Sequence, residues 1–133
     1  MANGTIAFDT LSTSGQISGT AKSVDADYLS TGSAKAWAQY EHDPIINKGF
    51  NTASITDNAT GDQSITYTNS MDGTAYAVTT SGTIDDSSYQ VFVSVDHDRG
   101  GPRAAGVDLN SVSDGGGLTD AELLSFVSHG DLA

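Results

Sequence analysis

Hydrophobic and polar residues alternate with a period of two in several stretches of this chain. In residues 34–40 the alanines and Tyr40 occupy one set of alternate positions, and Lys35, Trp37 and Gln39 occupy the other. Successive side chains of a β-strand point to opposite faces, so this period indicates a half-buried strand. We therefore predict a strand over residues 34–40, with Tyr40 on one face and Trp37 on the other.

The clearest alternation lies in residues 88–95. One set of alternate positions holds Tyr89, Val91, Val93 and Val95, and the other holds Gln90, Phe92 and Ser94. A row made mostly of β-branched residues needs a covered face, so we predict a central strand of a sheet. The row is expected to lie in the main hydrophobic core.

Turn-forming residues separate these strands from their neighbours. Residues 57–62, Asp-Asn-Ala-Thr-Gly-Asp, lie between two strand-like runs, 50–56 and 63–68. Asp, Asn and Gly tolerate the left-handed backbone conformation and form turns with their own side chains, so this segment is predicted to reverse an antiparallel hairpin. A further turn over residues 71–74 precedes a strand over residues 75–79.

Length and composition fit one β-rich domain. The chain has 133 residues, of which 37% are hydrophobic and 15 are Gly, and it has no Cys. This length can bury a core without disulfides, and many small residues suit short strands joined by tight turns. We predict an all-β fold, a small antiparallel β-sandwich or jelly-roll-like domain over residues 33–133, preceded by an extended N-terminal arm or linker over residues 1–32.

The apolar residues of the arm are too sparse to form a core of their own. They lie on short strand-like runs, chiefly at Ile6, Phe8, Leu11 and Ile17. Two interpretations remain open: an arm that adds strands to a neighbouring subunit, or a flexible linker. In the first interpretation these four residues form an oligomer or virion interface.

Several short motifs stand in and around the predicted hairpin. They are Ala34-Lys35-Ala36-Trp37, Phe50-Asn51, Ser54-Ile55-Thr56-Asp57-Asn58 and Thr60-Gly61-Asp62. Together with residues 23–29 and the C-terminal Gly130-Asp131-Leu132-Ala133, they resemble a module found in tail-fibre-like structural proteins of tailed bacteriophages, notably marine ones. The resemblance implies a structural protein of the virion, made in the host cytoplasm and assembled as a homo-oligomer, in particular a trimer. It also implies a closing strand over residues 125–129.

Residues 118–124 carry the one helical signal in the sequence. Thr119 and Glu122 have the spacing of a capping box, and acidic residues lie in what would be the first turn. We predict at most two helical turns here, which lead into the closing strand or replace its start.

The charge balance of the chain indicates which classes of partner it can bind. Seventeen acidic residues against five basic ones give a formal net charge of −12. Such a field repels phosphates, so no nucleic-acid partner is expected. No stretch approaches the roughly 20 apolar residues that span a bilayer, so no membrane insertion is expected. The acidic surface either solvates the protein or docks on a basic partner, such as other virion proteins of the tail or capsid.

Candidate catalytic residues are few. His42, His97 and His129 lie far apart and show no His-Glu-x-x-His spacing, and the chain has no Gly-x-Ser-x-Gly motif. Without Cys, a thiolate zinc site is also excluded. We therefore expect a non-enzymatic protein with surface histidines in loops and without a cofactor.

The loop over residues 96–103 shares some features with a metal-binding loop. Asp96 and Asp98 followed by Gly are similar to the start of a calcium-binding loop. Gly100 takes the place of the ligand at position five, and Val107 that of the Glu at position twelve. No metal site is therefore predicted.

Two classes of function follow. The first is a structural protein of a tailed-phage virion, tail-fibre-like or a fibre or capsid decoration (cement) component, which could contribute to host attachment. The second is a carbohydrate-binding module that recognises a host-surface glycan. Its possible contacts are Trp37, Tyr40, Asp96, His97, Asp98 and Arg99. Trp37 itself is either a half-buried core anchor or a platform for a sugar.

Overall fold

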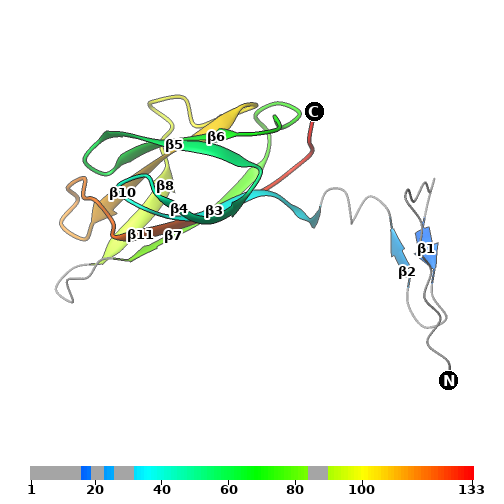
Figure 1. Cartoon of the computed structure of the whole chain (residues 1–133), viewed down its shortest axis with the longest axis horizontal. Coiled ribbons are helices and arrows are strands. Elements are labelled where there is room, and N and C mark those ends of the chain that lie inside the picture. Colours follow the sequence, from blue (N-terminus) through cyan, green and yellow to red (C-terminus); the bar gives the residue numbers. More distant parts are fainter. Residues whose placement is uncertain (1–15, 19–22, 26–31, 84–89) are drawn as a thin grey trace, which may run out of the picture.

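The computed structural model describes residues 16–18, 23–25, 32–83 and 90–133. The regular elements in these residues are strands, and two antiparallel sheets pack face to face (Figure 1). This arrangement confirms the predicted all-β sandwich.

Each main sheet has four long strands. In the first sheet the spatial order is β4 (Ile46–Phe50), β3 (Ala34–Glu41), β11 (Leu123–His129) and β7 (Ala77–Thr83). In the second sheet it is β5 (Thr52–Ala59), β6 (Asp62–Tyr67), β10 (Gly106–Ser113) and β8 (Val91–Val95), and the short β9 (Pro102–Arg103) also pairs with β10. Every pairing is antiparallel, so a face of each sheet can cover the core while the other faces solvent.

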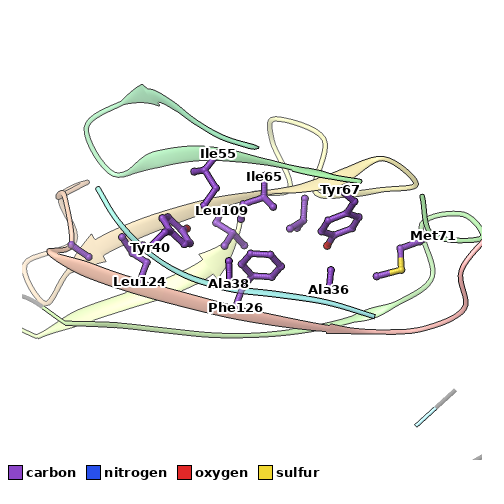
Figure 2. Close-up of a cluster of buried hydrophobic side chains, with 12 residues drawn as sticks. Ala36, Ala38, Tyr40, Ile55, Ile65, Tyr67, Met71, Leu109, Leu124 and Phe126 are labelled. Atoms are coloured by element: carbon purple, nitrogen blue, oxygen red, sulfur yellow. The ribbon is translucent and has the colours of Figure 1, made fainter. Parts of the chain in front are cut away.

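The core lies between the two sheets. Figure 2 shows Ala38 and Phe126 of the first sheet facing Ile65 and Tyr67 of the second. On β3 the residues Ala36, Ala38 and Tyr40 are buried, whereas the alternate positions are partly or fully exposed. The predicted alternation is therefore confirmed from Ala36 to Tyr40, whereas Ala34 is partly exposed and lies beyond a shift in the register with β11.

The chain crosses from the first sheet to the second at one residue, Asn51, between β4 and β5. Asn51 has a φ of 52°, and it is the one non-glycine residue with a positive φ among the described residues. Asn tolerates this left-handed conformation better than most residues, because its short side chain can bond to nearby backbone groups. This property allows a crossing without a longer loop.

The predicted hairpin over residues 57–62 is present but tighter than expected. β5 runs to Ala59 and β6 starts at Asp62, so Thr60 and Gly61 form the tip. Gly61 has a φ of 67°, and a Cβ there would lie 2.5 Å from the carbonyl oxygen of Ser111. A glycine is required at this position for both reasons.

The prediction of a central strand over residues 88–95 is wrong. The strand observed there, β8, pairs on one side with β10 and is an edge strand, and Tyr89 lies outside the described residues. The edge of β7 covers it instead, because Thr80 Oγ1 donates a 2.5 Å hydrogen bond to the carbonyl oxygen of Val93. Val93 is partly buried and packs against the core cluster. The valine row thus faces the core, but from the rim of the sandwich.

The predicted helix over residues 118–124 is also wrong. Leu118 forms an isolated bridge with Val112, and β11 starts at Leu123. The polar groups of this segment are used in tertiary contacts: Thr119 N donates to the carbonyl oxygen of Ser111 at 3.0 Å. The strand implied over residues 125–129 is present within β11.

The N-terminal region contributes a separate pair of short strands. β1 (Gln16–Ser18) and β2 (Ser23–Asp25) form a two-stranded antiparallel sheet (Figure 1). Ile17 lies in β1, whereas Ile6, Phe8 and Leu11 lie outside the described residues. Their role at an interface stays a prediction. Across the part of the chain that is described, no helix has the length and apolar character needed to cross a bilayer.

Candidate functional site

Trp37 and Tyr40 do not share a surface. Tyr40 is 0% exposed and its hydroxyl donates a 3.2 Å hydrogen bond to Gln63 Oε1 between the sheets. Trp37 lies on the opposite face of β3 and is partly exposed. Because residues separated by an odd number along a strand point to opposite faces, one ligand cannot contact both. The predicted glycan contact at Tyr40 is therefore wrong.

The loop that contains Asp96, His97, Asp98 and Arg99 lies on the other sheet. The backbone N–H of Asp96 donates to the carbonyl oxygen of Asp108 on β10 at 2.8 Å, which fixes the loop to the second sheet. Arg99 Nε lies 2.5 Å from Asp62 Oδ2 on β6. Trp37 belongs to the outer face of the first sheet, so the structure does not bring the loop and Trp37 together.

Two arginines of this region neutralise buried carboxylates. Arg99 pairs with Asp62, and Arg103 pairs with Asp108. The side chains of the two aspartates are only 3% and 2% exposed, so each requires a charged or hydrogen-bonding partner. Ser64 Oγ also donates to Asp108 Oδ1 at 2.7 Å. These ion pairs stabilise the second sheet and give both arginines a role in the fold.

The segment that is similar to a calcium loop is a hydrogen-bonded turn. Asp96 Oδ1 accepts hydrogen bonds from the backbone N–H groups of Asp98 at 3.0 Å and Arg99 at 3.3 Å. An aspartate that bonds to the backbone two and three residues ahead is typical of a turn. Among the residues with described positions, no group of three or more His, Asp and Glu side chains is placed to hold a metal ion.

The outer face of the first sheet, which we call the Trp37 face, carries an apolar row. Phe50, Trp37 and Val127 are cross-strand partners on β4, β3 and β11. Phe50 is 55% exposed, and Trp37 and Val127 are partly exposed. The Cβ atoms of residues directly opposite each other on a sheet lie about 5 Å apart, on the same face. The three side chains are therefore neighbours on the outer face of the first sheet.

A polar row runs beside the apolar one on the same face. Its members are cross-strand partners on the four strands, namely Lys48, Gln39, Ser125 and Ser81. The hydroxyl groups of Ser81 and Ser125 lie 2.7 Å apart, which shows that the two side chains point to the same side of the sheet. The row offers amide and hydroxyl groups as hydrogen-bond donors and acceptors, plus one ammonium group.

A cleft of about 430 Å³ lies at the end of the first sheet. Its lining consists of Glu41, His42, Thr83, Glu122 and Leu123. His42 Nε2 lies 3.3 Å from Asp43 Oδ1. The cleft brings together carboxylates from β3 and from the segment before β11, which the sequence separates by 81 positions (122 − 41). Sequence reasoning could not find this pair, because its proximity depends on how β3 and β11 align.

The histidines lie in loops or at the end of a strand, whereas Tyr67 is buried and Tyr76 is partly buried. His42 and His97 lie in loops as predicted, whereas His129 ends β11 on the Trp37 face. Burial raises the pKa of Tyr67 and of Tyr76 above the ordinary value for a phenol. Tyr67 hydrogen-bonds with Ser128 inside the core at 2.8 Å, so its hydroxyl group is used by the fold.

Sequence reasoning found Trp37 but missed its neighbours Phe50 and Lys48. The signal was present, since Lys48 lies two positions before Phe50, the first residue of the strand-like run 50–56. Period-two spacing places both on one face of a strand. Their pairing with β3, Phe50 with Trp37 and Lys48 with Gln39, depends on strand order and register, which no local pattern reveals. Comparison with protein-family models, with curated proteins and with solved structures gives no significant match to this chain.

Proposed function

We propose that this protein is a non-enzymatic structural component of a tailed-phage virion, tail-fibre-like or part of a head fibre or capsid decoration. The resemblance on which the proposal rests lies in short motifs around residues 34–62. The observation that supports it is the position of these motifs in the fold. Ala36 is fully buried in the core, Asn51 makes the crossing between sheets, and Gly61 forms the tip of a hairpin.

Each of these motif residues has a packing or backbone role. Asn51 Nδ2 donates to the carbonyl oxygens of Lys35 at 2.9 Å and Asn69 at 3.0 Å. The backbone N–H of Gly61 donates to Asp120 Oδ1 at 2.7 Å, which ties the hairpin to the segment before β11. These residues hold the sandwich together. Their positions are compatible with the structural role that the resemblance implies.

The proposal includes a homo-oligomer in which the N-terminal arm pairs with a neighbouring copy. Among the described strands, β4 pairs with β3 alone and β5 pairs with β6 alone, so each presents one open edge. An open edge has unpaired N–H and C=O groups and can accept a further strand. A trimer is the order that the resemblance implies.

The location in the particle is tested by quantitative mass spectrometry of purified virions from the virus that encodes this chain. Hundreds of copies per particle are expected for a capsid decoration protein, and a few to a few dozen for a tail or fibre protein. Absence of the chain from particles that contain the other structural proteins would contradict the proposal.

The arm is tested by light scattering of the full chain beside a variant that lacks residues 2–29. We expect the full chain to be an oligomer and the truncated chain to be a folded monomer or a weaker oligomer. Phe8→Ser should have part of the same effect, because it removes one apolar contact of the arm. An oligomer that is unchanged after truncation would show that the arm does not supply the contacts.

A further inference from the structure

The Trp37 face differs from the rest of the surface in its charge. The chain has five basic residues, and two of them, Lys35 and Lys48, lie on the strands of this face. Among the described residues no carboxylate lies within salt-bridge distance of either lysine, and Lys35 Nζ donates to Ser33 Oγ at 2.8 Å. In a protein of net charge −12, this face therefore combines free positive charge with an exposed aromatic surface.

Carboxylates are nearly absent from the face itself. Of the residues of β3, β4, β7 and β11, Glu41 is the one acidic residue, and it lies at the end of β3 that lines the cleft. The apolar row and the polar row beside it carry no carboxylate, and Glu41 is the next outward residue of β3 after Gln39. The two rows thus combine apolar and positive groups on an otherwise acidic chain. Such a surface complements a ligand that has an apolar side and a negatively charged group.

We propose that the Trp37 face binds an oligosaccharide that carries sparse carboxylate groups, such as uronic acid or sialic acid units. The C–H side of a pyranose ring is apolar and packs on the negative face of an aromatic ring, a role for Trp37 and Phe50. The hydroxyl groups of the sugar bond to Gln39 and to the serines of the polar row. A carboxylate on the sugar pairs with Lys48. This inference goes beyond the virion role and does not depend on it.

The charge of the whole chain limits how negative the ligand can be. A polyphosphate such as single-stranded nucleic acid could also stack on Trp37, but each phosphate adds repulsion from a protein of net charge −12. An oligosaccharide with one carboxylate uses the local lysines and suffers little of this repulsion. Sparse charge is therefore part of the proposal.

A second copy of the chain is a poorer occupant of the face. The second sheet would have to offer its carboxylates to Lys35 and Lys48. On that sheet Asp62 and Asp108 are buried and already paired with Arg99 and Arg103, which leaves Asp57 on β5 as the one exposed carboxylate of its described strands. A single carboxylate cannot pair with both lysines.

The experiment is a glycan array of matched pairs, read with the full-length protein. Each carboxylated glycan is printed beside the neutral glycan that differs only at the carboxylate, for example cellobiouronic acid beside cellobiose. We expect binding to carboxylated members and weaker binding to their neutral partners. The best pair is then measured by titration calorimetry at low and high salt. Raising NaCl from 0.05 to 0.5 M should reduce the preference, since it shortens the Debye length from about 14 to about 4 Å.

Phe50→Ser and Phe92→Ser form a matched pair of variants. Phe50 is 55% exposed on the Trp37 face, and Phe92 is 58% exposed on β8 of the other sheet. Phe50→Ser should weaken binding by about two- to tenfold, the range of one aromatic contact, whereas Phe92→Ser should leave it unchanged. Lys48→Gln should weaken binding of the carboxylated glycan by about two- to fivefold, the effect expected when an exposed ion pair is lost. Binding of the neutral partner should not change.

Several outcomes overturn the proposal. They are no binding to any member of the array by the folded protein, equal binding to both members of each pair, and equal loss in Phe50→Ser and Phe92→Ser. An eight-nucleotide oligothymidine that binds as tightly as the best glycan would also overturn it, in favour of a nucleic-acid surface. A Trp37→Ala variant is informative only with its melting temperature, because Trp37 is partly buried, and for this reason the two phenylalanine variants decide the question.

Discussion

The side chain of Asn51 bonds to both polar groups of the Asn69 backbone. Its Nδ2 donates to the Asn69 carbonyl oxygen at 3.0 Å, and its Oδ1 accepts from the Asn69 N–H at 2.6 Å. The same Nδ2 donates to the carbonyl oxygen of Lys35 at 2.9 Å. One residue at the crossing between the sheets therefore satisfies backbone groups at the start of β3 and in the loop after β6.

Two substitutions of Asn51 should distinguish the contribution of its side-chain hydrogen bonds to stability from the contribution of its backbone conformation. Asn51→Ala removes three hydrogen bonds of a buried side chain. It also places alanine, which tolerates the left-handed conformation less well than Asn, at a φ of 52°. We therefore expect a loss of about 3 kcal/mol in the free energy of unfolding. Asn51→Gly loses the same bonds but adopts this φ readily, so it should be about 1 kcal/mol more stable than Asn51→Ala. Urea unfolding of the three proteins gives the order. An alanine variant as stable as the glycine variant would show that the backbone is not strained.

The tyrosines should make stability fall at high pH. Burial raises the pKa of Tyr40 well above its ordinary value of 10.0. Above pH 10 the unfolded chain loses this proton while the folded protein keeps it, so ionisation favours unfolding. Tyr40 therefore makes its full contribution to the free energy of unfolding below pH 10. This contribution falls by about 1 kcal/mol per pH unit as the pH rises toward the pKa of Tyr40 in the folded protein.

The measurement for Tyr40 is the free energy of unfolding between pH 8 and pH 11.5. Tyr40→Phe is the control, and it should show a flatter curve above pH 10. It also loses the hydrogen bond to Gln63, so its stability at pH 8 should differ from that of the wild type by about 1 kcal/mol. Parallel curves above pH 10 would contradict the assignment of the pH dependence to Tyr40.

Local alternation predicted which side chains of a strand share a face, but not where the strand lies. The pattern on β3 placed Ala36, Ala38 and Tyr40 correctly. The same pattern on β8 was interpreted as a central strand, although β8 is at an edge. A row of valines is equally compatible with both positions, because β7 of the other sheet covers the row here. Only tertiary packing distinguishes the two.

The wrong helix has a similar cause. Thr119 and Glu122 have the spacing of a capping box, and local propensity offered nothing against it. In the structure the backbone of this segment bonds to Ser111, and Asp120 accepts from Gly61 N. Gly61 lies 59 positions from Asp120, and Ser111 lies 8 positions from Thr119, beyond the span of one helical turn, so a helix-capping pattern could not reveal them.

The candidate site was predictable residue by residue but not as a surface. Trp37 stands out in the sequence as the lone Trp, and the alternation places it on the face opposite Tyr40 without saying which of the two faces is buried. Its neighbours on the Trp37 face come from β4 and β11, and their identity depends on strand order and register. The grouping of Trp37 with the loop at Asp96 failed for the same reason, since sequence does not say which sheet carries a loop.

The ion pair between Arg103 and Asp108 should be worth more to the fold than a surface pair. Arg103→Met leaves the 2% exposed carboxylate of Asp108 with Ser64 as its remaining side-chain partner, and we expect a loss of about 2 kcal/mol. The double variant with Asp108→Asn should recover part of this loss, because it removes the unpaired buried charge. Chemical unfolding of both single variants and the double variant gives the coupling. Strict additivity would mean that the pair contributes nothing beyond its separate side chains.

The contact between Gly82 and Val93 joins the edges of the two sheets. A methyl group added at position 82 would lie 2.7 Å from Val93 Cγ2, and 3.5 Å from Val91 Cγ1. Gly82→Ala should therefore overpack the rim and cost about 1 to 3 kcal/mol. Val93→Ala alone should cost about 1 kcal/mol, because Val93 is only partly buried.

Combining the two substitutions tests whether this contact closes the sandwich. Val93→Ala removes the atom that the added methyl group would meet, so the double variant with Gly82→Ala should be about 1 kcal/mol more stable than the sum of the single losses predicts. Val91→Ala with Gly82→Ala is the control, since a separation of 3.5 Å is an ordinary contact and should give little coupling. Thermal and urea unfolding of the five variants measure both couplings. If the Val93 pair were additive and the Val91 pair coupled, β8 would meet β7 in a different register, and the edge contact described for Thr80 and Val93 would be wrong.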